Sequence, residues 1–236
     1  MNKYNIYKCS LQHIPTELSM AIERYNIDYN IANRNGVKMG RLAEKIYFES
    51  KSKSANIPFC HTMEGQAFGS KVKLDYVNGN RIVEFPIDKL VDIDKIPVAD
   101  LQNDKINVVF DAIEYLKNKS IPVTVNVVGP VTLATSILPI EEIYKGMAKS
   151  TDDTKKLFQL IEDFLVEYIN KIVDLEVDLL SYADPTGTLD ILGVKLYKKV
   201  AGPSFLRVLE KIDSKSNTKI HICPKTSTSL LAVDLI

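Results

Sequence analysis

Residues 151–185 read TDDTKKLFQLIEDFLVEYINKIVDLEVDLLSYADP, a long amphipathic helix followed at once by a short strand. Either Ser150 or Thr151 is expected to cap the helix, and two aspartates follow in its first turn, where the helix dipole favours acidic side chains. Apolar residues recur at helical spacing over 157–173, so one broad face is predicted to be buried. The strand-like run at 177–183 comes directly after it.

The same helix-then-strand unit recurs along the chain. The expected pairs are helix 39–50 with strand 57–60, helix 106–119 with strand 121–128, and helix 192–211 with strand 218–223, the last helix breaking near Gly202-Pro203. Strands that are each preceded by a helix indicate a parallel sheet with helical crossovers. One more strand is expected at 5–11.

Section 72–86 departs from this pattern, because it carries an Asn78-Gly79 turn between two alternating runs. These features predict a β-hairpin inserted into the α/β fold. No repeat or low-complexity linker divides the chain, so residues 1–236 are expected to form a single domain. Four or five parallel strands are too few for a closed (β/α)8 barrel. We therefore expect either a small open sheet or an incomplete barrel.

Composition excludes several classes of protein. The chain has 236 residues, 30 basic and 30 acidic, so it lacks the basic excess of a nucleic-acid-binding protein. Three cysteines form no disulfide framework, and the N-terminus has no secretory signal, so a cytoplasmic protein is expected. The uncharged segment 121–140 is as long as a membrane span, but its three prolines favour a buried element of a soluble fold.

His221 and Cys223 are the most informative pair of residues. On a strand, residues two apart point to the same side, so the imidazole and the thiol are predicted to share a face. Both groups are good zinc ligands, although zinc needs three or four ligands from the protein. The alternative is a core histidine beside an inert buried cysteine.

Two further strands are predicted to end at polar or glycine-containing turns. Asp184 follows the strand at 177–183, where a carboxylate can serve as ligand, base or orienting group, or simply start an Asp-Pro turn. Gly129 follows the strand at 121–128, where it permits either close approach of a ligand or a tight turn. His61 and Glu64 follow the strand at 57–60 and are candidates for substrate contact, whereas Cys9 and His13 have no partners in the sequence.

Four segments together resemble the uroporphyrinogen decarboxylase superfamily, and in particular its corrinoid-dependent methyltransferase branch. They are IPFCHTMEGQAFGSKV at 57–72, VNVVGPVTLAT at 125–135, YADPTGTLDILG at 182–193 and IHIC at 220–223. Each motif is weak alone, but the four occur in family order. The resemblance implies a TIM-type barrel, which would be truncated at the C-terminus of this chain.

The resemblance assigns His221 and Cys223 as two zinc ligands and places a third, another Cys, beyond Ile236. It implies methyl transfer between methylcobalamin, carried by a separate corrinoid protein, and a zinc-activated small thiol such as coenzyme M. Asp184 would complete or tune the site, His61 and Glu64 would contact substrate, and Gly129 would approach the cofactor. No membrane or nucleic-acid partner is expected.

Two alternatives remain within the superfamily. One is a decarboxylase, which fits less well because the N-terminal arginine motif that holds substrate carboxylates is missing, and Cys60 stands near the position of the catalytic Asp. The other is a degenerate member that only binds a corrinoid or a partner subunit.

Overall fold

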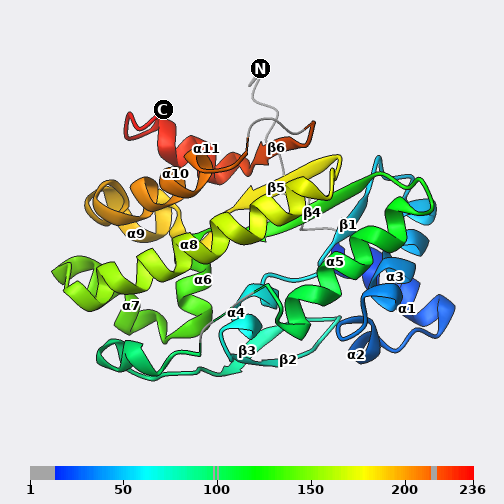
Figure 1. The fold of residues 1–236 in the computed structure, drawn as a ribbon, viewed down its shortest axis with the longest axis horizontal. Coiled ribbons are helices and arrows are strands. Elements are labelled where there is room, and N and C mark those ends of the chain that lie inside the picture. The colour runs from blue at the N-terminus through cyan, green and yellow to red at the C-terminus, as the bar shows by residue number, and fades with distance from the viewer. Residues whose placement is uncertain (1–13, 98, 100, 214–216) are drawn as a thin grey trace, which may run out of the picture.

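The computed structural model describes residues 14–97, 99, 101–213 and 217–236 (Figure 1). Within these ranges the main sheet contains β1 (Ala55–Ile57), β4 (Val123–Val128), β5 (Leu179–Ala183) and β6 (Lys219–Ile222). Every neighbouring pair is parallel, and the strands lie side by side in chain order. The predicted parallel sheet is therefore confirmed, and its progressive order is that of an arc of a barrel. The strand expected at 5–11 lies outside the described residues.

Helices precede these strands as the sequence predicts: α3 (Gly36–Ser50) before β1, α5 (Asp104–Lys117) before β4 and α8 (Asp152–Asp174) before β5. Thr151 is the residue that caps α8, because its Oγ1 accepts a hydrogen bond from the Thr154 N–H at 3.2 Å. Ser150 instead ends α7 (Ile140–Lys149), with a left-handed φ of 53°.

The helical segment before β6 differs from the prediction in the position of its break. It consists of α9 (Leu189–Leu196), the π-helical turn η4 (Tyr197–Ala201) and α10 (Gly202–Glu210). The non-helical residue is Gly193, with φ 69° and ψ 161°. Ala201 and Gly202 both have helical φ and ψ, so Gly202-Pro203 lies where the π-helical turn passes into α10 and does not interrupt the helical segment. The other helical segments are α1 (Ile14–Tyr25), α2 (Tyr29–Ala32), α4 (Met63–Ala67), η2 (Leu90–Lys95), α6 (Pro130–Ile137), η3 (Pro185–Gly187) and α11 (Pro224–Leu231).

The predicted hairpin is present as β2 (Lys71–Lys73) and β3 (Arg81–Glu84), which pair antiparallel. Its connection is a loop over residues 74–80 rather than a two-residue turn at Asn78-Gly79. The Asp75 carboxylate organises this loop by accepting the N–H groups of Val77 at 3.1 Å and Asn78 at 2.9 Å.

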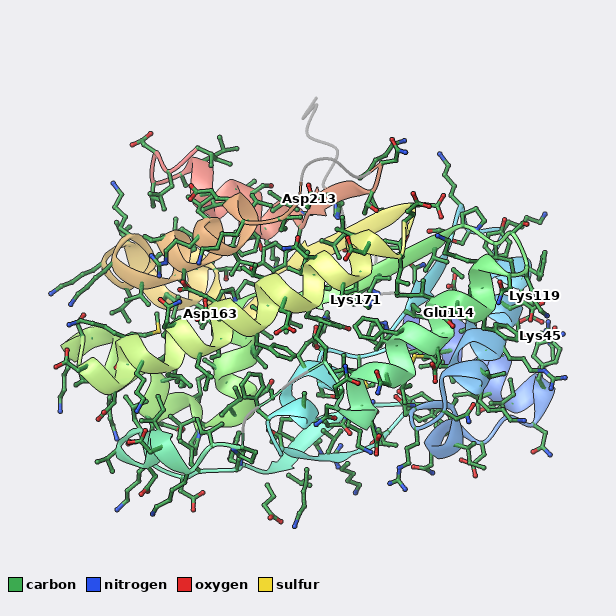
Figure 2. The ribbon with its side chains drawn as sticks, viewed as in Figure 1. Lys45, Glu114, Lys119, Asp163, Lys171 and Asp213 are labelled. Carbon is green, nitrogen blue, oxygen red and sulfur yellow. The ribbon has the colours of Figure 1, made fainter. Side chains whose placement is uncertain are left out.

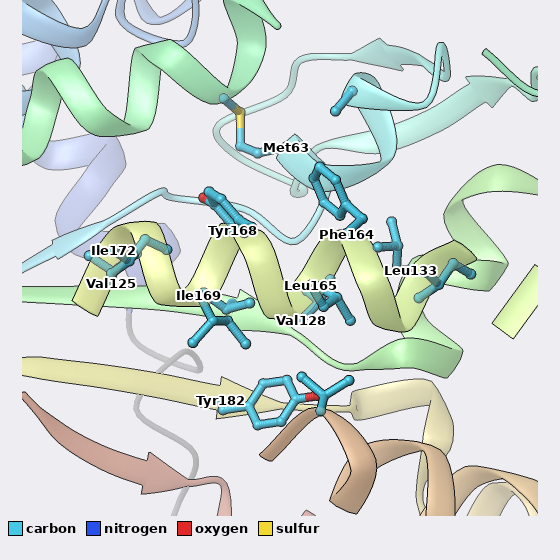
Figure 3. Packing of buried hydrophobic residues seen from close by; sticks show 14 of the residues in the cluster. Met63, Val125, Val128, Leu133, Phe164, Leu165, Tyr168, Ile169, Ile172 and Tyr182 are labelled. Atoms are coloured by element: carbon cyan, nitrogen blue, oxygen red, sulfur yellow. The ribbon is translucent and has the colours of Figure 1, made fainter. Parts of the chain in front are cut away.

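Strand alternation gives the main sheet one apolar and one polar face. Val125 and Leu180 are in register on the apolar face, and they belong to the same core as residues of α8 such as Ile169 and Ile172 (Figure 3). Ile220 continues this row on β6, where it is 38% exposed. Asn126, Ser181 and His221 are in register on the opposite face. Charged side chains such as those of Asp163 and Lys171 lie on the outer side of α8 (Figure 2). The sheet therefore offers a row of polar side chains on the face that looks inward in a barrel.

Segment 121–140 is a buried element, as predicted: it forms β4 and α6, and nearly all of its side chains are buried. In the part of the chain that the structure describes, no helix is both long enough and apolar enough to cross a membrane. Strand β1 ends at Ile57, before Cys60, because Pro58 follows it and has no N–H to continue the ladder.

Candidate functional site

His221 and Cys223 stand at the edge strand β6, at its carboxyl end. His221 is opposite Ser181 and is exposed, and Cys223 is half-buried one residue beyond the strand. The Cys223 N–H still donates to the Tyr182 carbonyl oxygen at 3.0 Å, so the strand ladder continues through it. Alternation then places the imidazole and the thiol on the same face, as the sequence predicts.

The Cys223 thiol is a sulfur donor and the His221 imidazole is a nitrogen donor, and zinc binds both kinds of ligand. Within the described ranges, however, no three His, Cys, Asp or Glu side chains are grouped closely enough to hold a metal ion. His221 and Cys223 therefore fit two positions of a zinc site and do not complete one.

Asp184 lies at the carboxyl end of β5 and is 2% exposed. Its Oδ1 accepts the Thr132 N–H at 2.7 Å and the Thr132 hydroxyl at 2.6 Å, and its Oδ2 accepts the Val131 N–H at 3.1 Å. The carboxylate thereby caps α6 from a neighbouring strand and lies at the positive end of that helix. Both of its oxygens are engaged in holding the fold.

Two glycines make room for this carboxyl group. A Cβ on Gly129 would come within 2.5 Å of the Asp184 Cβ, and a Cβ on Gly187 would collide with the carboxylate itself. Gly129 has an ordinary φ of −81°, so the contact with Asp184, not the backbone conformation, requires glycine there. Its predicted part in cofactor binding stays a prediction.

Asp184 also connects to the segment that carries Cys223. Its N–H donates to the Thr226 hydroxyl at 3.2 Å, and Thr226 lies on α11, the helix that starts directly after Cys223. Burial raises the pKa of Asp184, and the hydrogen bonds from Thr132 and Val131 oppose that rise. Asp184 is thus placed to fix the turns after β4 and β6 together.

Glu64 is a second buried carboxyl group at the same turn. It lies on α4, is 1% exposed, and accepts the Val128 N–H through Oε1 at 3.1 Å. Among the described residues its Oε2 has no hydrogen-bond partner, and burial raises the pKa of Glu64 to about 7. Glu64 and Asp184 therefore hold the backbone just before and just after Gly129.

His61 follows β1 in a half-buried position, and burial lowers the pKa of its imidazole. Strands β4 and β5 separate β1 from β6, so His61 and His221 stand at opposite edges of the described sheet. The structure therefore brings Asp184, Gly129 and Glu64 together around the turn after β4. Asp184 also contacts the helix that follows Cys223, whereas His61 lies at the other edge of the sheet.

Sequence reasoning did not identify Thr226 or Asn80 as site residues. Thr226 follows Cys223-Pro224, and a hydroxyl in the first turn of a helix gives no specific signal in the sequence. Asn80 lies in the hairpin loop, and its Oδ1 accepts hydrogen bonds from the Tyr29 hydroxyl at 3.2 Å and the Asp75 N–H at 2.9 Å. The bond between Asp184 and Thr226 joins residues 42 positions apart, and the bond between Tyr29 and Asn80 joins residues 51 positions apart, so no local pattern shows them.

The model of the family described as Uroporphyrinogen decarboxylase (URO-D) matches residues 19–233. This chain belongs to that family. Methylcobamide:CoM methyltransferase MtaA of Methanosarcina barkeri is 27% identical over 206 residues, which are 84% of this chain and 59% of the relative. Methylcobamide:CoM methyltransferase MtbA of Methanosarcina mazei is 26% identical over 208 residues, covering 86% of this chain and 61% of that protein.

A solved structure, a methyltransferase from Methanosarcina mazei, superimposes with a TM-score of 0.78 at 22% identity, over 91% of this chain and 64% of its own. The likeness confirms that the open sheet belongs to the barrel-type fold of this family. The chain spans about three fifths of the length of the curated relatives it matches.

Proposed function

We propose that this protein transfers a methyl group between methylcobalamin, carried by a corrinoid protein, and a small thiol such as coenzyme M. The observation that carries the proposal is the pair of His221, on β6, and Cys223, one residue beyond it with its N–H still bonded to β5, in a chain whose curated relatives are methylcobamide:CoM methyltransferases. The carboxyl ends of parallel strands are where barrel enzymes bind substrate.

In this proposal His221 and Cys223 hold zinc together with one or two further ligands outside the described residues. Bound zinc would supply the acidity that converts the substrate thiol to a thiolate, the form that acts as a nucleophile. His221 presents its imidazole from an exposed edge, and Cys223 presents its thiol at the start of α11. Only one residue separates them in the chain, so the two donor groups come from the same short segment.

Asp184 acts in this proposal as a positioning residue. Both of its oxygens already accept hydrogen bonds, from the Val131 and Thr132 amides and the Thr132 hydroxyl, and it is buried. Through the hydrogen bond from its N–H to the Thr226 hydroxyl, it sets the position of α11, the helix that follows Cys223.

Glu64 and His61 are proposed to contact substrate. Each keeps one buried polar atom without a hydrogen-bond partner among the described residues, Oε2 of Glu64 and Nδ1 of His61. Buried polar atoms are normally paired, so the missing partners make these two side chains candidates for a polar contact with substrate.

The experiment is an assay of the purified protein with methylcobalamin and coenzyme M, with zinc content measured on the same sample. Methylation of the thiol with zinc bound supports the proposal. Release of CO2 from uroporphyrinogen without thiol methylation would replace it with the decarboxylase alternative. Binding of a corrinoid with neither activity would instead identify a degenerate, binding-only member.

A further inference from the structure

A cavity of about 350 Å³ lies between α3 and the segment that joins α1 to α2. Its volume falls within the range of about 300–1,000 Å³ that is usual for small-molecule sites. One wall is cationic and the other is aromatic and aliphatic; the residues that form them are Lys38, Arg41 and Lys45 on α3, and Tyr25, Ile27 and Ile31 on the opposite side. Lys45 lies at the end of the molecule that α1, α2 and α3 form (Figure 2).

The cationic wall is one face of α3. Lys38, Arg41 and Lys45 are three and four positions apart, so their side chains leave the helix on the same side. Among the residues that the structure describes, none of the three forms an ion pair. Glu44 and Glu49, the two acidic residues of α3, pair with cations outside the cavity lining. The positive charge of this wall is therefore not neutralised within its own helix.

Asp28 is the only acidic residue in the described part of the lining. Its Oδ1 already accepts the N–H groups of Asn30 at 2.8 Å and Ile31 at 3.1 Å, which caps α2. The lining thus has three positive charges against one negative charge. A phosphate monoester carries a charge of about −1.5 to −2 at pH 7, which balances this excess. The planar guanidinium of Arg41 also matches the geometry of a phosphate group.

The opposite wall offers apolar surface in a fixed position. The Tyr25 hydroxyl donates to Glu49 Oε1 at 2.7 Å, and Lys45 Nζ lies 5.0 Å from the centre of the Tyr25 ring. Ile31 is 51% exposed, although it is a large apolar residue. An aromatic or aliphatic group that bound against Tyr25 and Ile31 would remove this surface from water, which is favourable.

We propose that this cavity binds a small organic phosphate monoester. The phosphate group contacts Lys38, Arg41 and Lys45, and the organic part of the ligand packs against Tyr25 and Ile31. Strands β4 and β5 separate β1, which follows α3, from β6, which carries His221. The site is therefore separate from the proposed zinc site and does not depend on the proposed methyl transfer.

The test is a titration of the full chain, labelled with 15N, followed by NMR. The probes are phenyl phosphate, inorganic phosphate and benzyl alcohol, which carry both groups, the phosphate alone and the ring alone. Phenyl phosphate is expected to give saturable shifts at residues 25–31 and 38–45, with an affinity roughly tenfold or more above that of either other probe. No saturable shift at these residues, or equal affinities for phenyl phosphate and inorganic phosphate, would overturn the proposal.

Lys38→Gln tests the cationic wall. Lys38 is exposed, and the variant removes one positive charge while it keeps a polar side chain. We expect it to weaken the binding of phenyl phosphate roughly tenfold. The matched control is Lys171→Gln, which removes the same charge from the outer side of α8, away from the cavity (Figure 2). Equal weakening in the two variants, or unchanged affinity in Lys38→Gln, would contradict the proposed phosphate contact.

Ile31→Ala tests the apolar wall separately. It is expected to weaken the binding of phenyl phosphate severalfold and to leave the binding of inorganic phosphate unchanged, because only the organic part contacts Ile31. Unchanged affinity for phenyl phosphate would contradict this contact. The comparison of the three probes on the wild type decides the proposal if a variant does not fold.

Discussion

At the scale of single residues, Glu64 makes the stability of the fold depend on pH. Burial raises its pKa from the usual 4.5 to about 7, so the folded state favours the protonated carboxyl group. The penalty for ionising it is therefore absent below pH ~4.5 and grows as the pH rises to about 7, reaching on the order of 3 kcal/mol. Glu64→Gln keeps an oxygen for the Val128 N–H and cannot ionise. Its stability relative to the wild type is expected to increase from pH 5 to pH 7 and then level off.

Urea unfolding at several pH values measures this difference. The control is Glu167→Gln, a change at an exposed position of α8. It should follow the wild type across the range. Parallel stability curves for Glu64→Gln and the wild type would show that Glu64 is ionised in the folded protein at neutral pH.

Gly129 gives a second prediction at this scale. A Cβ there would lie 2.5 Å from the Asp184 Cβ, so Gly129→Ala must displace a carboxyl group that accepts three hydrogen bonds. We expect a loss of about 3 kcal/mol in the free energy of unfolding. At Gly79 a Cβ meets nothing within 4 Å, and only the left-handed φ of 89° opposes an alanine, so Gly79→Ala is expected to cost about 1 kcal/mol. Equal losses for the two variants would mean that the contact with Asp184 is not the constraint.

At the scale of elements, the start of α6 depends on Thr132. Its hydroxyl donates to Asp184 Oδ1 at 2.6 Å and accepts the Thr186 N–H at 3.1 Å, which joins α6 to the turn after β5. Thr132→Val keeps the shape of the side chain and removes these bonds together with a third, to the Thr186 hydroxyl at 3.0 Å, so we expect a loss of about 2 kcal/mol, measured by denaturant unfolding. Thr135→Val, on the same helix, breaks the bond of the Thr135 hydroxyl to the Thr132 carbonyl and a longer contact with the Thr186 hydroxyl at 3.3 Å, but no bond to Asp184. It is expected to cost less than half as much, and a larger loss at Thr135 would contradict this account of the cap.

Local pattern made the helices before the strands predictable, because each of them shows its buried face within its own sequence, whereas the shorter helices such as α4 and α6 were not predicted. The residues of α8 repeat their apolar positions every turn, and β4 is a continuous buried run. The hairpin loop was harder to predict, since the Asp75 carboxylate, rather than the Asn78-Gly79 pair, organises it. The break in the helical segment before β6 lies at Gly193, and the spacing of apolar residues gives no sign that this glycine has a left-handed φ.

At the scale of the whole molecule, the sheet could be predicted as parallel because helices alternate with strands. The closeness of His221 and Cys223 could be predicted because they are two residues apart, at the end of β6 and directly after it. The bonds of Asp184 to Thr132 and of Glu64 to Val128 join residues 52 and 64 positions apart, and only the packed fold brings them together. The roles of His221, Cys223, His61 and Gly129 in binding remain predictions.

The central claim, that Cys223 is a zinc ligand of a thiol methyltransferase, is tested most directly by comparing Cys223→Ser with Cys60→Ser. Both variants remove one half-buried thiol, but only Cys223 shares a strand face with His221. Zinc content and methyl transfer from methylcobalamin to coenzyme M are measured on the same samples. We predict that Cys223→Ser loses zinc together with at least 100-fold of the activity, since loss of an outer partner of a metal ligand already costs about 10–100-fold, and that Cys60→Ser keeps its zinc. Unchanged zinc content and thiol methylation in a folded Cys223→Ser protein would contradict the claim.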